Sequence, residues 1–366
     1  MKICYISNSA SPSTNASSLQ TAKLCEYLAK EGHIVKLILP NTGFKKNIYS
    51  YYNIKNKFKV TKLNYFKKFP IGLNYYLYSL MSILISNYKD QDLYITRNFF
   101  TSFLLSIMSK KHVLEVHDDI KIEGRIIQIL VRYFKILNFK SLIKIIATTK
   151  TLKKEYVNYG VLKDKIKVLH NASSLKSKFS KYKNKNYLKI GYFGSIYKSR
   201  GIELIIELSK IDKTNKYYVY GGSINKIKKI KYNLKNKNIY FFPYIPYSKV
   251  QNKIDKVDVC ILPYSSKITV SGNVGDISNY TSPLKIFDYM KLGKLIISSN
   301  LPVLREILEN NKNSILIKKY KDEKEWYKEI LKINKNFNKY EKLRKNAFIY
   351  AKKFDLTWRI KELLSN

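Results

Sequence analysis

Apolar and polar positions alternate along the first forty residues in an order that predicts a strand, a helix and a second strand. Residues 2–7 (KICYIS) are strand-like, and a polar loop follows at residues 8–17. Apolar residues at helical spacing predict a helix over residues 19–30, and the apolar run 34–39 predicts the next strand. This order is typical of a parallel sheet, whose ligands bind at the loops after the carboxyl ends of the strands.

The same alternation continues through two halves of the chain. Residues 75–85 and 99–108 are apolar segments that predict buried helices, and the basic, aperiodic stretch 173–187 predicts a linker between domains. The sequence thus predicts an α/β protein with two Rossmann-like domains, at 1–178 and 188–345, facing each other across a cleft. Further strands are expected at residues 93–96, 113–116, 143–147, 166–169, 188–194, 217–220, 239–242, 257–262 and 295–298, and further helices at 201–210, 247–254, 284–290 and 350–364.

The segment TSPLKIFDYMKLGKL carries the strongest chemical signal. Thr281 and Ser282 are cap-type residues, and Pro283 suits the first position of the helix that follows. Lys285 in the first turn opposes the helix dipole unless an anion lies there too, and Asp288 shares its face. This pattern favours a nucleotide, with its diphosphate at the helix start and its ribose on the acid. A capped surface helix with an ion pair between the two charged residues explains the pattern equally well.

The formal net charge of +43 over 366 residues indicates attraction to anionic surfaces, although abundant Lys, Asn, Ile and Tyr together are also what codon bias produces. Residues 44–69 interleave Lys with Phe and Tyr, which suits an interfacial membrane surface or a single-strand groove. No nucleic-acid-binding motif accompanies them, so nucleic acid is not an expected partner. Cys4, Cys25 and Cys260 form no CxxC pair, which indicates a reducing compartment without disulfide or zinc.

We expect a cytoplasmic protein that is soluble or peripheral on the membrane's inner face. The N-terminus leads directly into a strand without a signal peptide, and the longest apolar segments are shorter than a spanning helix needs.

Several long segments resemble the GT-B glycosyltransferases of family 4, the group 1 transferases. DVCILPYSS and YTSPLKIFDYMKLGKLIISSNLPVLREIL resemble the donor-domain block of the family, and YFGSIYKSRGIELII resembles the start of that domain. SPSTNASSLQTAKLCEYLAKEGHIVKL, LYITRN, VLEVHDD and TLKKEYVNYGVLKDKIKVLHNAS resemble parts of the acceptor domain. The resemblance implies a retaining, metal-independent transfer from a nucleotide-sugar to an acceptor hydroxyl, with no cofactor. It also implies that a last helix, within 346–366 and containing Trp358, crosses back to the first domain.

The resemblance assigns roles to particular residues of the donor domain. Asp288 takes the place of the ribose-binding acid, and Ser282 and Lys285 would hold the diphosphate. Arg200 would neutralise the β-phosphate during catalysis. In the loop after the first donor-domain strand, Gly194 and Ser195 would contact the donor, and Lys198 would compensate for a cation that the family often has at position 195.

In the acceptor domain, His117 matches the histidine near the transferred sugar, and Glu115 either orients it or is structural. Arg97 is expected to contact a phosphate or a loop carbonyl. We expect the acceptor to be a lipid-linked saccharide in cell-surface polysaccharide synthesis, because the basic and aromatic first domain suits an anionic membrane.

Some positions depart from the family pattern: Tyr280 replaces an acid that contacts sugar hydroxyls, and Asn15-Ala16 and Asn171-Ala172 replace glycine-containing pairs. Two other functions therefore stay open. One is a GT-B-shaped sugar-nucleotide epimerase that uses Glu115, Asp118 and Asp119, and the other is a basic scaffold with a decayed site. The DxD triplet at 90–92 precedes a strand, so we interpret it as a solvated turn and not as a metal site.

Overall fold

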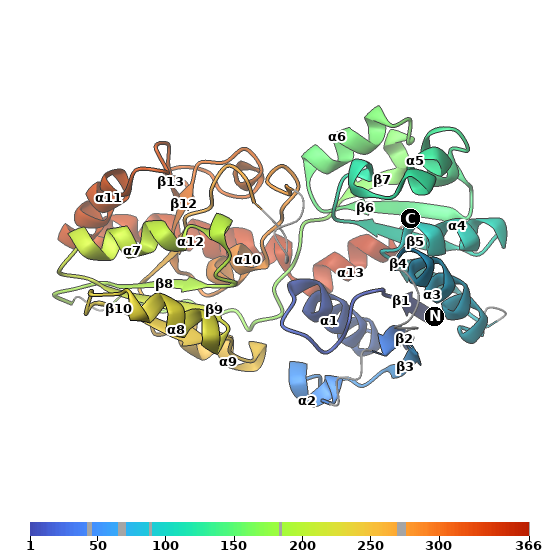
Figure 1. Ribbon diagram of the computed structural model, residues 1–366, viewed down its shortest axis with the longest axis horizontal. Coiled ribbons are helices and arrows are strands. Elements are labelled where there is room, and N and C mark those ends of the chain that lie inside the picture. The colour runs from blue at the N-terminus through green and yellow to red at the C-terminus, as the bar shows by residue number, and fades with distance from the viewer. Residues whose placement is uncertain (42–45, 65–70, 88–89, 183–184, 269–275, 366) are drawn as a thin grey trace. The chain divides into compact units, whose positions relative to one another are not determined.

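The computed structural model describes residues 1–41, 46–64, 71–87, 90–182, 185–268 and 276–365. The contacts divide the chain into two compact units, Met1–Asn171 with Leu356–Asn366, and Ala172–Asp355. Each unit contains one parallel β-sheet with helices packed on it (Figure 1). Among the described residues, no helix is both long and apolar enough to cross a membrane.

The first unit has a seven-stranded parallel sheet in the order β3-β2-β1-β4-β5-β6-β7. Apolar strands at its centre are buried along their whole length, as parallel sheets covered on both faces require. The helix α13 belongs to this unit and packs against α1. The elements are β1 (Lys2–Ile6), α1 (Ala16–Lys30), β2 (Ile34–Asn41), α2 (Ile48–Tyr52), β3 (Lys59–Asn64), α3 (Ile71–Ile85), β4 (Leu93–Thr96), α4 (Phe99–Ile107), β5 (His112–Val116), η1 (Ile120–Ile122), α5 (Arg125–Arg132), η2 (Ile136–Asn138), β6 (Leu142–Ala147), α6 (Lys150–Asn158), η3 (Lys163–Lys165), β7 (Ile166–Val168) and α13 (Leu356–Leu364).

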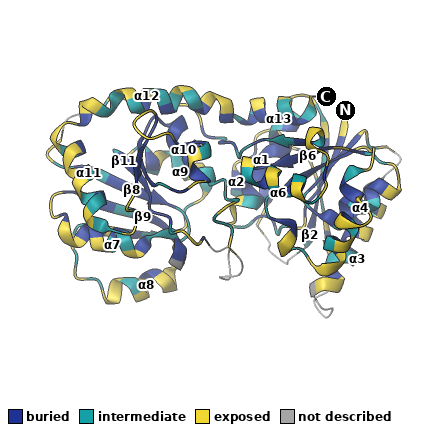
Figure 2. Cartoon of the chain, turned by 90° about the horizontal axis from the view of Figure 1, so that it is seen from above, coloured by how far each residue is buried: buried dark blue, intermediate teal, exposed yellow. Residues whose placement is uncertain are grey.

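The second unit has a six-stranded parallel sheet in the order β10-β9-β8-β11-β12-β13. Figure 2 shows its buried strands between helices whose outer faces are exposed, with α7 and α8 on one side and α12 on the other. The elements are β8 (Lys189–Phe193), η4 (Lys198–Arg200), α7 (Ile202–Ile211), β9 (Lys216–Gly222), α8 (Ile224–Tyr232), β10 (Ile239–Pro243), α9 (Tyr247–Ile254), β11 (Val259–Leu262), α10 (Leu284–Lys291), β12 (Leu295–Ser299), η5 (Leu304–Glu306), β13 (Ile315–Ile317), α11 (Glu323–Lys335), η6 (Phe337–Tyr340), α12 (Glu341–Tyr350) and η7 (Ala351–Phe354).

Each sheet has a point at which the strand order reverses. In the first unit β1 lies between β2 and β4, and in the second unit β8 lies between β9 and β11. Open α/β sheets bind ligands beyond the carboxyl ends of the strands at such a point. A ligand site is therefore expected at the loops after β1 and β4 in the first unit, and at the loops after β8 and β11 in the second unit.

Two expectations from the sequence are wrong. Residues 350–364 are not one helix, because Asp355 is extended (φ −83°, ψ 146°) and separates η7 from α13. The predicted helix at 75–85 exists as part of α3, but its Leu80 and Leu84 are exposed. The described part of 44–69 forms α2 and β3 with Phe58 buried, and residues 44–45 and 65–69 of this stretch lie outside the described residues, so its membrane or single-strand role stays a prediction.

Candidate active site

The loops after β8 and β11 meet the start of α10 at the reversal point of the second sheet. Gly194 follows β8 with a positive φ of 152°, and a Cβ atom there would overlap the Nζ atom of Lys285. Gly201 has a φ of 73°, and a Cβ atom there would overlap the carbonyl oxygen of Pro263 after β11. The two glycines therefore let a lysine and a neighbouring loop approach the backbone closely.

Lys285 points into this site and not along an exposed helix face. Its Nζ atom lies 4.0 Å from the ring centroid of Tyr192 and 5.3 Å from that of Tyr264. Burial, and then the nearby charge of Arg200, lower the pKa of Lys285 well below its ordinary value. Among the described residues, no carboxylate forms an ion pair with it, so the surface ion pair with Asp288 that the sequence allowed is wrong.

Arg200 is the second cation of the site and ends the short helix η4. Its guanidinium carbon lies 5.0 Å from the ring centroid of Tyr264. Aromatic rings attract cations without neutralising them, so the Tyr264 ring can hold both positive charges beside each other. Two cations whose mutual repulsion lowers a lysine pKa form a site that an anionic ligand would relieve.

The amino end of α10 supplies further hydrogen-bond donors. Pro283 occupies the N-cap position and Leu284 is the first residue of the helix, so α10 begins one residue later than the predicted placement of Pro283 at the first helical position. The first N–H groups of a helix have no intrahelical acceptors and carry the positive end of the dipole. Ser282 is partly exposed directly before this end. The helix start is therefore suited to phosphate oxygens.

Asp288 lies one turn further along α10, but it is buried, with 4% of its surface exposed. Its Oδ1 atom accepts hydrogen bonds from the Ser173 hydroxyl (2.6 Å) and the Tyr247 hydroxyl (2.8 Å). Burial raises the pKa of Asp288 to about 6, although these two donors and Lys291 act in the opposite direction. The sequence did not indicate these two hydroxyl donors, because they lie far from Asp288 in the chain.

Three other residues predicted near this site are described by their positions in the chain and, for Ser195, by one hydrogen bond. Ser195 is partly exposed, and its carbonyl oxygen accepts a hydrogen bond from the Tyr192 hydroxyl (2.8 Å). The backbone of Lys198 lies in η4, and its side chain is outside the described structure. Tyr280 is partly exposed in the turn before α10. Tyr192 and Tyr264 were not predicted as site residues, although they stand in the quoted segments YFGSIYKSRGIELII and DVCILPYSS.

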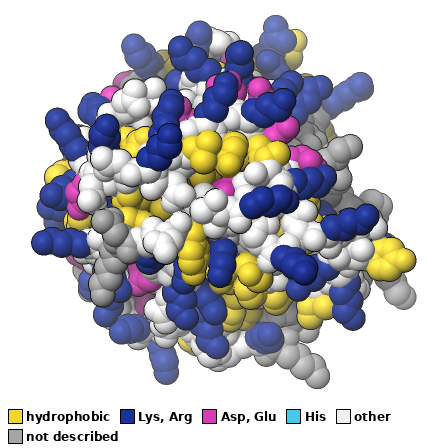
Figure 3. Space-filling view, turned by 90° about the vertical axis from the view of Figure 1, so that its left-hand side faces the viewer, with side chains coloured by type: hydrophobic (Ala, Val, Ile, Leu, Met, Phe, Trp, Pro, Cys, Tyr) yellow, Lys and Arg dark blue, Asp and Glu magenta, His cyan; other side chains and the backbone are white. Residues whose placement is uncertain are grey.

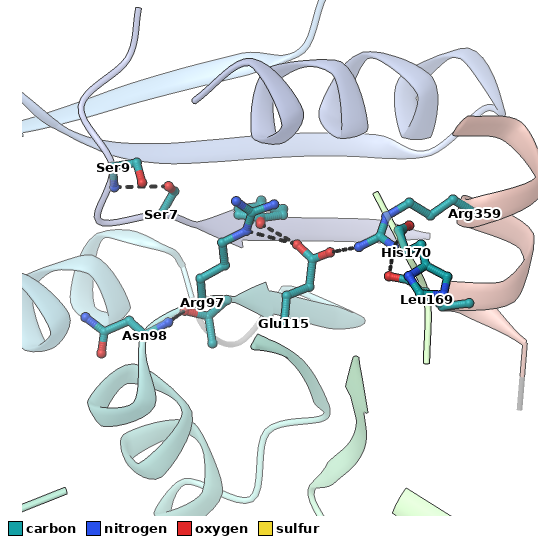
Figure 4. A network of polar contacts seen from close by, with 10 residues as sticks. Ser7, Ser9, Arg97, Asn98, Glu115, Leu169, His170 and Arg359 are labelled. Carbon is teal, nitrogen blue, oxygen red and sulfur yellow. Dashed lines mark hydrogen bonds and ion pairs between the residues drawn. The ribbon is translucent and has the colours of Figure 1, made fainter. Parts of the chain in front are cut away.

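The first unit contains a buried ionic network around Glu115 of β5 (Figure 4). Glu115 pairs with Arg97 (3.2 Å) and with Arg359 of α13, and it accepts a hydrogen bond from the Tyr5 hydroxyl (2.8 Å). These cations hold the pKa of Glu115 below its ordinary value in spite of its burial. Arg359 also donates to the carbonyl oxygens of Leu169 (2.6 Å) and His170 (2.7 Å), beyond β7.

His117 follows β5, two residues after Glu115. Its Nε2 atom is buried and has no hydrogen-bond partner in the part of the chain that the structure describes. Burial and the nearby Arg97 lower the pKa of His117 to about 3, so the imidazole is neutral at physiological pH. A neutral, unsatisfied ring nitrogen is suited to a hydroxyl group of a ligand. Glu115 and Arg97 are less suited than His117 to bind a ligand hydroxyl, because they are already paired with each other.

Among the described residues, no group of three or more His, Cys, Asp or Glu could hold a metal ion. Asp92, in the DxD triplet before β4, accepts a hydrogen bond from the backbone N–H of Lys2 (2.7 Å), so it lies at the amino ends of the strands. Cys4, Cys25 and Cys260 are free and buried.

Two parallel sheets, and a cationic site at the reversal point of one of them, define an α/β protein that is suited to an anionic ligand. The sequence model of "Glycosyl transferases group 1" matches residues 173–349, and that of "Glycosyltransferase Family 4" matches residues 18–176. The chain therefore belongs to the group 1, family 4 glycosyltransferases. It is an enzyme that uses a nucleotide-sugar donor.

Solved structures support the GT-B fold that the sequence predicted. The chain is similar to HepE from Anabaena in complex with UDP and glucose (14% identity, TM-score 0.73, covering 100% of each chain). It is also similar to sucrose-phosphate synthase from Thermosynechococcus elongatus (14%, 0.74, covering 99% of this chain and 98% of that one). WaaG, a glycosyltransferase involved in lipopolysaccharide biosynthesis, matches at 12% identity and a TM-score of 0.65, covering 99% and 98%. A comparison with curated protein sequences finds no match.

Proposed function

We propose that this enzyme transfers a hexose-type sugar, with retention and without a metal ion, to a hydroxyl group of a lipid-linked saccharide in cell-surface polysaccharide synthesis. The observation that carries the proposal is the juxtaposition of Arg200 and Lys285 beside the start of α10, with no carboxylate paired to Lys285 among the described residues. A diphosphate leaving group fits these charges. Gly194 provides the space in which Lys285 reaches the loop after β8.

In this proposal the bond between the anomeric carbon and the diphosphate oxygen breaks, and its electron pair stays on the diphosphate. Arg200, Lys285 and the N–H groups of α10 stabilise the developing negative charge, with Ser282 and Lys198 as further donors. Fixed charges of this kind are commonly the largest contribution to catalysis. The acceptor hydroxyl forms the new bond on the face that the diphosphate leaves, and its proton passes to a phosphate oxygen. Retention then needs no protein nucleophile.

His117 is proposed, from the family resemblance, as the residue that binds a hydroxyl of the transferred sugar. Its neutral imidazole and its unsatisfied Nε2 atom suit such a hydrogen bond. Glu115 acts through the network of Arg97 and Arg359 and is a positioning residue, because its own oxygens are already occupied. This use of Glu115 disfavours the epimerase alternative, which needs free carboxylates. Asp288 stays a predicted ribose contact.

The acceptor class rests on similarity and charge. WaaG is described as involved in lipopolysaccharide biosynthesis, and the net charge of +43 favours an anionic membrane surface at the cytoplasmic face. HepE has been solved with UDP-glucose, so UDP-sugars are the first donors to test.

The experiment is a donor panel measured by calorimetry and by slow donor hydrolysis, using UDP-, GDP- and ADP-sugars. We expect one nucleotide to bind, and Lys285→Met and Arg200→Met each to weaken binding by about tenfold or more, because each removes a charge-assisted contact. Lys228→Met removes an exposed lysine from α8 in the same unit and is the matched control. Equal losses in all three variants, or no binding of any nucleotide, would contradict the proposal. The anomeric configuration of the product, measured by NMR, tests retention.

A further inference from the structure

Charge by itself does not mark a docking surface on the face shown in Figure 3. On the face shown in Figure 3, Lys and Arg side chains are dispersed among neutral and apolar ones. A surface that meets a membrane needs exposed apolar side chains as well, in a row flanked by cations. The first unit has such an arrangement on α5.

The helix α5 is apolar on two opposite sides. Ile127 and Val131 are 1% and 2% exposed and pack into the core. Ile126 and Ile129 are 55% and 48% exposed, and Tyr133, at the next position of the same helical row, is 71% exposed. A helix that only covers a sheet needs one apolar face, so packing on the sheet does not explain the second row.

Cations flank this outward row. Arg125 and Arg132 are exposed on α5 itself, and Lys121 and Lys135 are exposed on either side of it. Lys121 is also ion-paired with Asp119 (3.9 Å), and a further acid, Glu123, has its pKa raised to about 7 by burial and then by Asp118. Cations beside an exposed apolar row form the pattern of an interfacial helix, which inserts its apolar side chains and binds anionic headgroups with its cations.

A second helix of the same unit, α3, also exposes apolar side chains. The helix α3 has no charged residue, and its serine side chains face inward, where Ser79 and Ser82 donate to carbonyl oxygens of their own helix (2.8 and 2.6 Å). Its outward positions include Leu73, Leu80 and Leu84, which are 44%, 48% and 58% exposed. Helices that face water place their polar residues outward. This helix does the reverse.

These two helices are connected through α4. The helix α3 packs on α4, and both α4 and α5 contact η2. Figure 1 shows α3, α4 and α5 following one another along one edge of the first unit. The helices that carry the α5 row and the exposed leucines of α3 therefore lie in one region of this unit.

We propose that the outward row of α5 (Ile126, Ile129 and Tyr133 with Arg125 and Arg132), together with the exposed leucines of α3, docks on an anionic lipid bilayer. The proposal rests on the proposed function, because it gives the lipid-linked acceptor a surface at which the enzyme meets it. Apolar side chains enter the headgroup region, and the arginines bind lipid phosphates. The cations favour an anionic bilayer over a second copy of this chain, whose surface would be equally basic.

The test is sedimentation with vesicles of phosphatidylcholine, with and without phosphatidylglycerol. We expect binding that requires the anionic lipid and weakens as salt is added. Ile126→Gln with Ile129→Gln should lower the partition coefficient about tenfold, because two exposed isoleucines no longer leave water. Arg125→Gln with Arg132→Gln should lower it by about tenfold or more at low salt.

The matched control is Lys228→Gln with Lys229→Gln, which removes two exposed cations from α8 of the second unit. An equal loss in this control would mean that general charge causes binding, and it would overturn the inference. So would a dimer in sedimentation velocity that the isoleucine variants dissociate. Donor hydrolysis without vesicles separates the two proposals. Unbound vesicles with intact hydrolysis overturn only the docking surface, whereas bound vesicles without any nucleotide binding overturn only the proposed function.

Discussion

Asp288→Asn should change the pH dependence of stability in the second unit. The folded protein raises the pKa of this buried carboxyl from its ordinary value of 3.8 to about 6. Folding therefore favours the protonated form, and the stability that this carboxyl contributes is present below about pH 4. It is lost as the pH rises through about 6, and the shift of roughly 2 units corresponds to about 3 kcal/mol. Asparagine stays neutral and can still accept from the hydroxyls of Ser173 and Tyr247.

The assay is urea unfolding of both proteins between pH 4 and pH 8. The chain has two tryptophans, of which Trp326 is fully buried in the second unit and Trp358 lies on α13 of the first unit. In a Trp358→Phe background, fluorescence therefore follows the unit that contains Asp288. The free energy of unfolding of Asp288→Asn should rise relative to that of the parent protein by about 2–3 kcal/mol between pH 4 and pH 7.

Ser173→Ala is the companion variant, since it removes one donor that favours the charged carboxylate. The pH-dependent change should then move to higher pH. A stability difference between Asp288→Asn and its parent that stays constant from pH 4 to pH 8 would refute the reasoning. So would an Asp288→Asn protein that is less stable than its parent at pH 7, because the negative charge would then be needed.

Three further outcomes are expected. Gly194→Ala should weaken nucleotide binding in calorimetry by about tenfold or more, because its Cβ would displace the ammonium of Lys285; unchanged affinity would place the phosphates elsewhere. Arg359→Met should lower the free energy of unfolding by about 3–5 kcal/mol in urea titration, because Glu115 stays buried without one of its two cations; a loss below about 1 kcal/mol would contradict a buried network. The pKa of His117, about 3, predicts that its 13C-edited NMR signals do not titrate between pH 5 and pH 8, and titration there would show a charged imidazole.

The parallel sheets could be predicted because their strands are buried on both faces. Segments such as 93–96 and 113–116 are apolar runs bounded by polar residues, and the structure has β4 and β5 there. The C-terminal break at Asp355 carried no such signal, since no glycine or proline marks it. The short strand β13 and the small helix α2 were missed, because three to five residues give too few positions for a period to show.

Of the candidate site, the sequence could predict which residues are near the start of α10 but not how their side chains lie. Lys285 and Asp288 are three residues apart, and spacing alone made an ion pair as reasonable as a nucleotide site. The two side chains have different partners in the structure. Lys285 lies against the rings of Tyr192 in β8 and Tyr264 after β11, whereas Asp288 accepts hydrogen bonds from Ser173 and Tyr247. Those partners are distant in sequence, and periodicity contains no information about such contacts.

The helix α10 joins the cationic site to the points at which the chain enters and leaves the second unit. Its first turn holds Lys285, and its last residue, Lys291, donates to the carbonyl oxygen of Ser173 (3.1 Å) and pairs with Asp355 (2.5 Å). Ser173 and Asp355 lie next to the two unit boundaries and form a β-bridge with each other. Because α10 is eight residues long and holds both Lys285 and Lys291, we expect an anion bound at Lys285 also to affect the two boundary segments. Hydrogen exchange at the amides of residues 173 and 355 should therefore slow when nucleotide binds, and Lys291→Met should abolish that slowing while Lys285 still binds the phosphates.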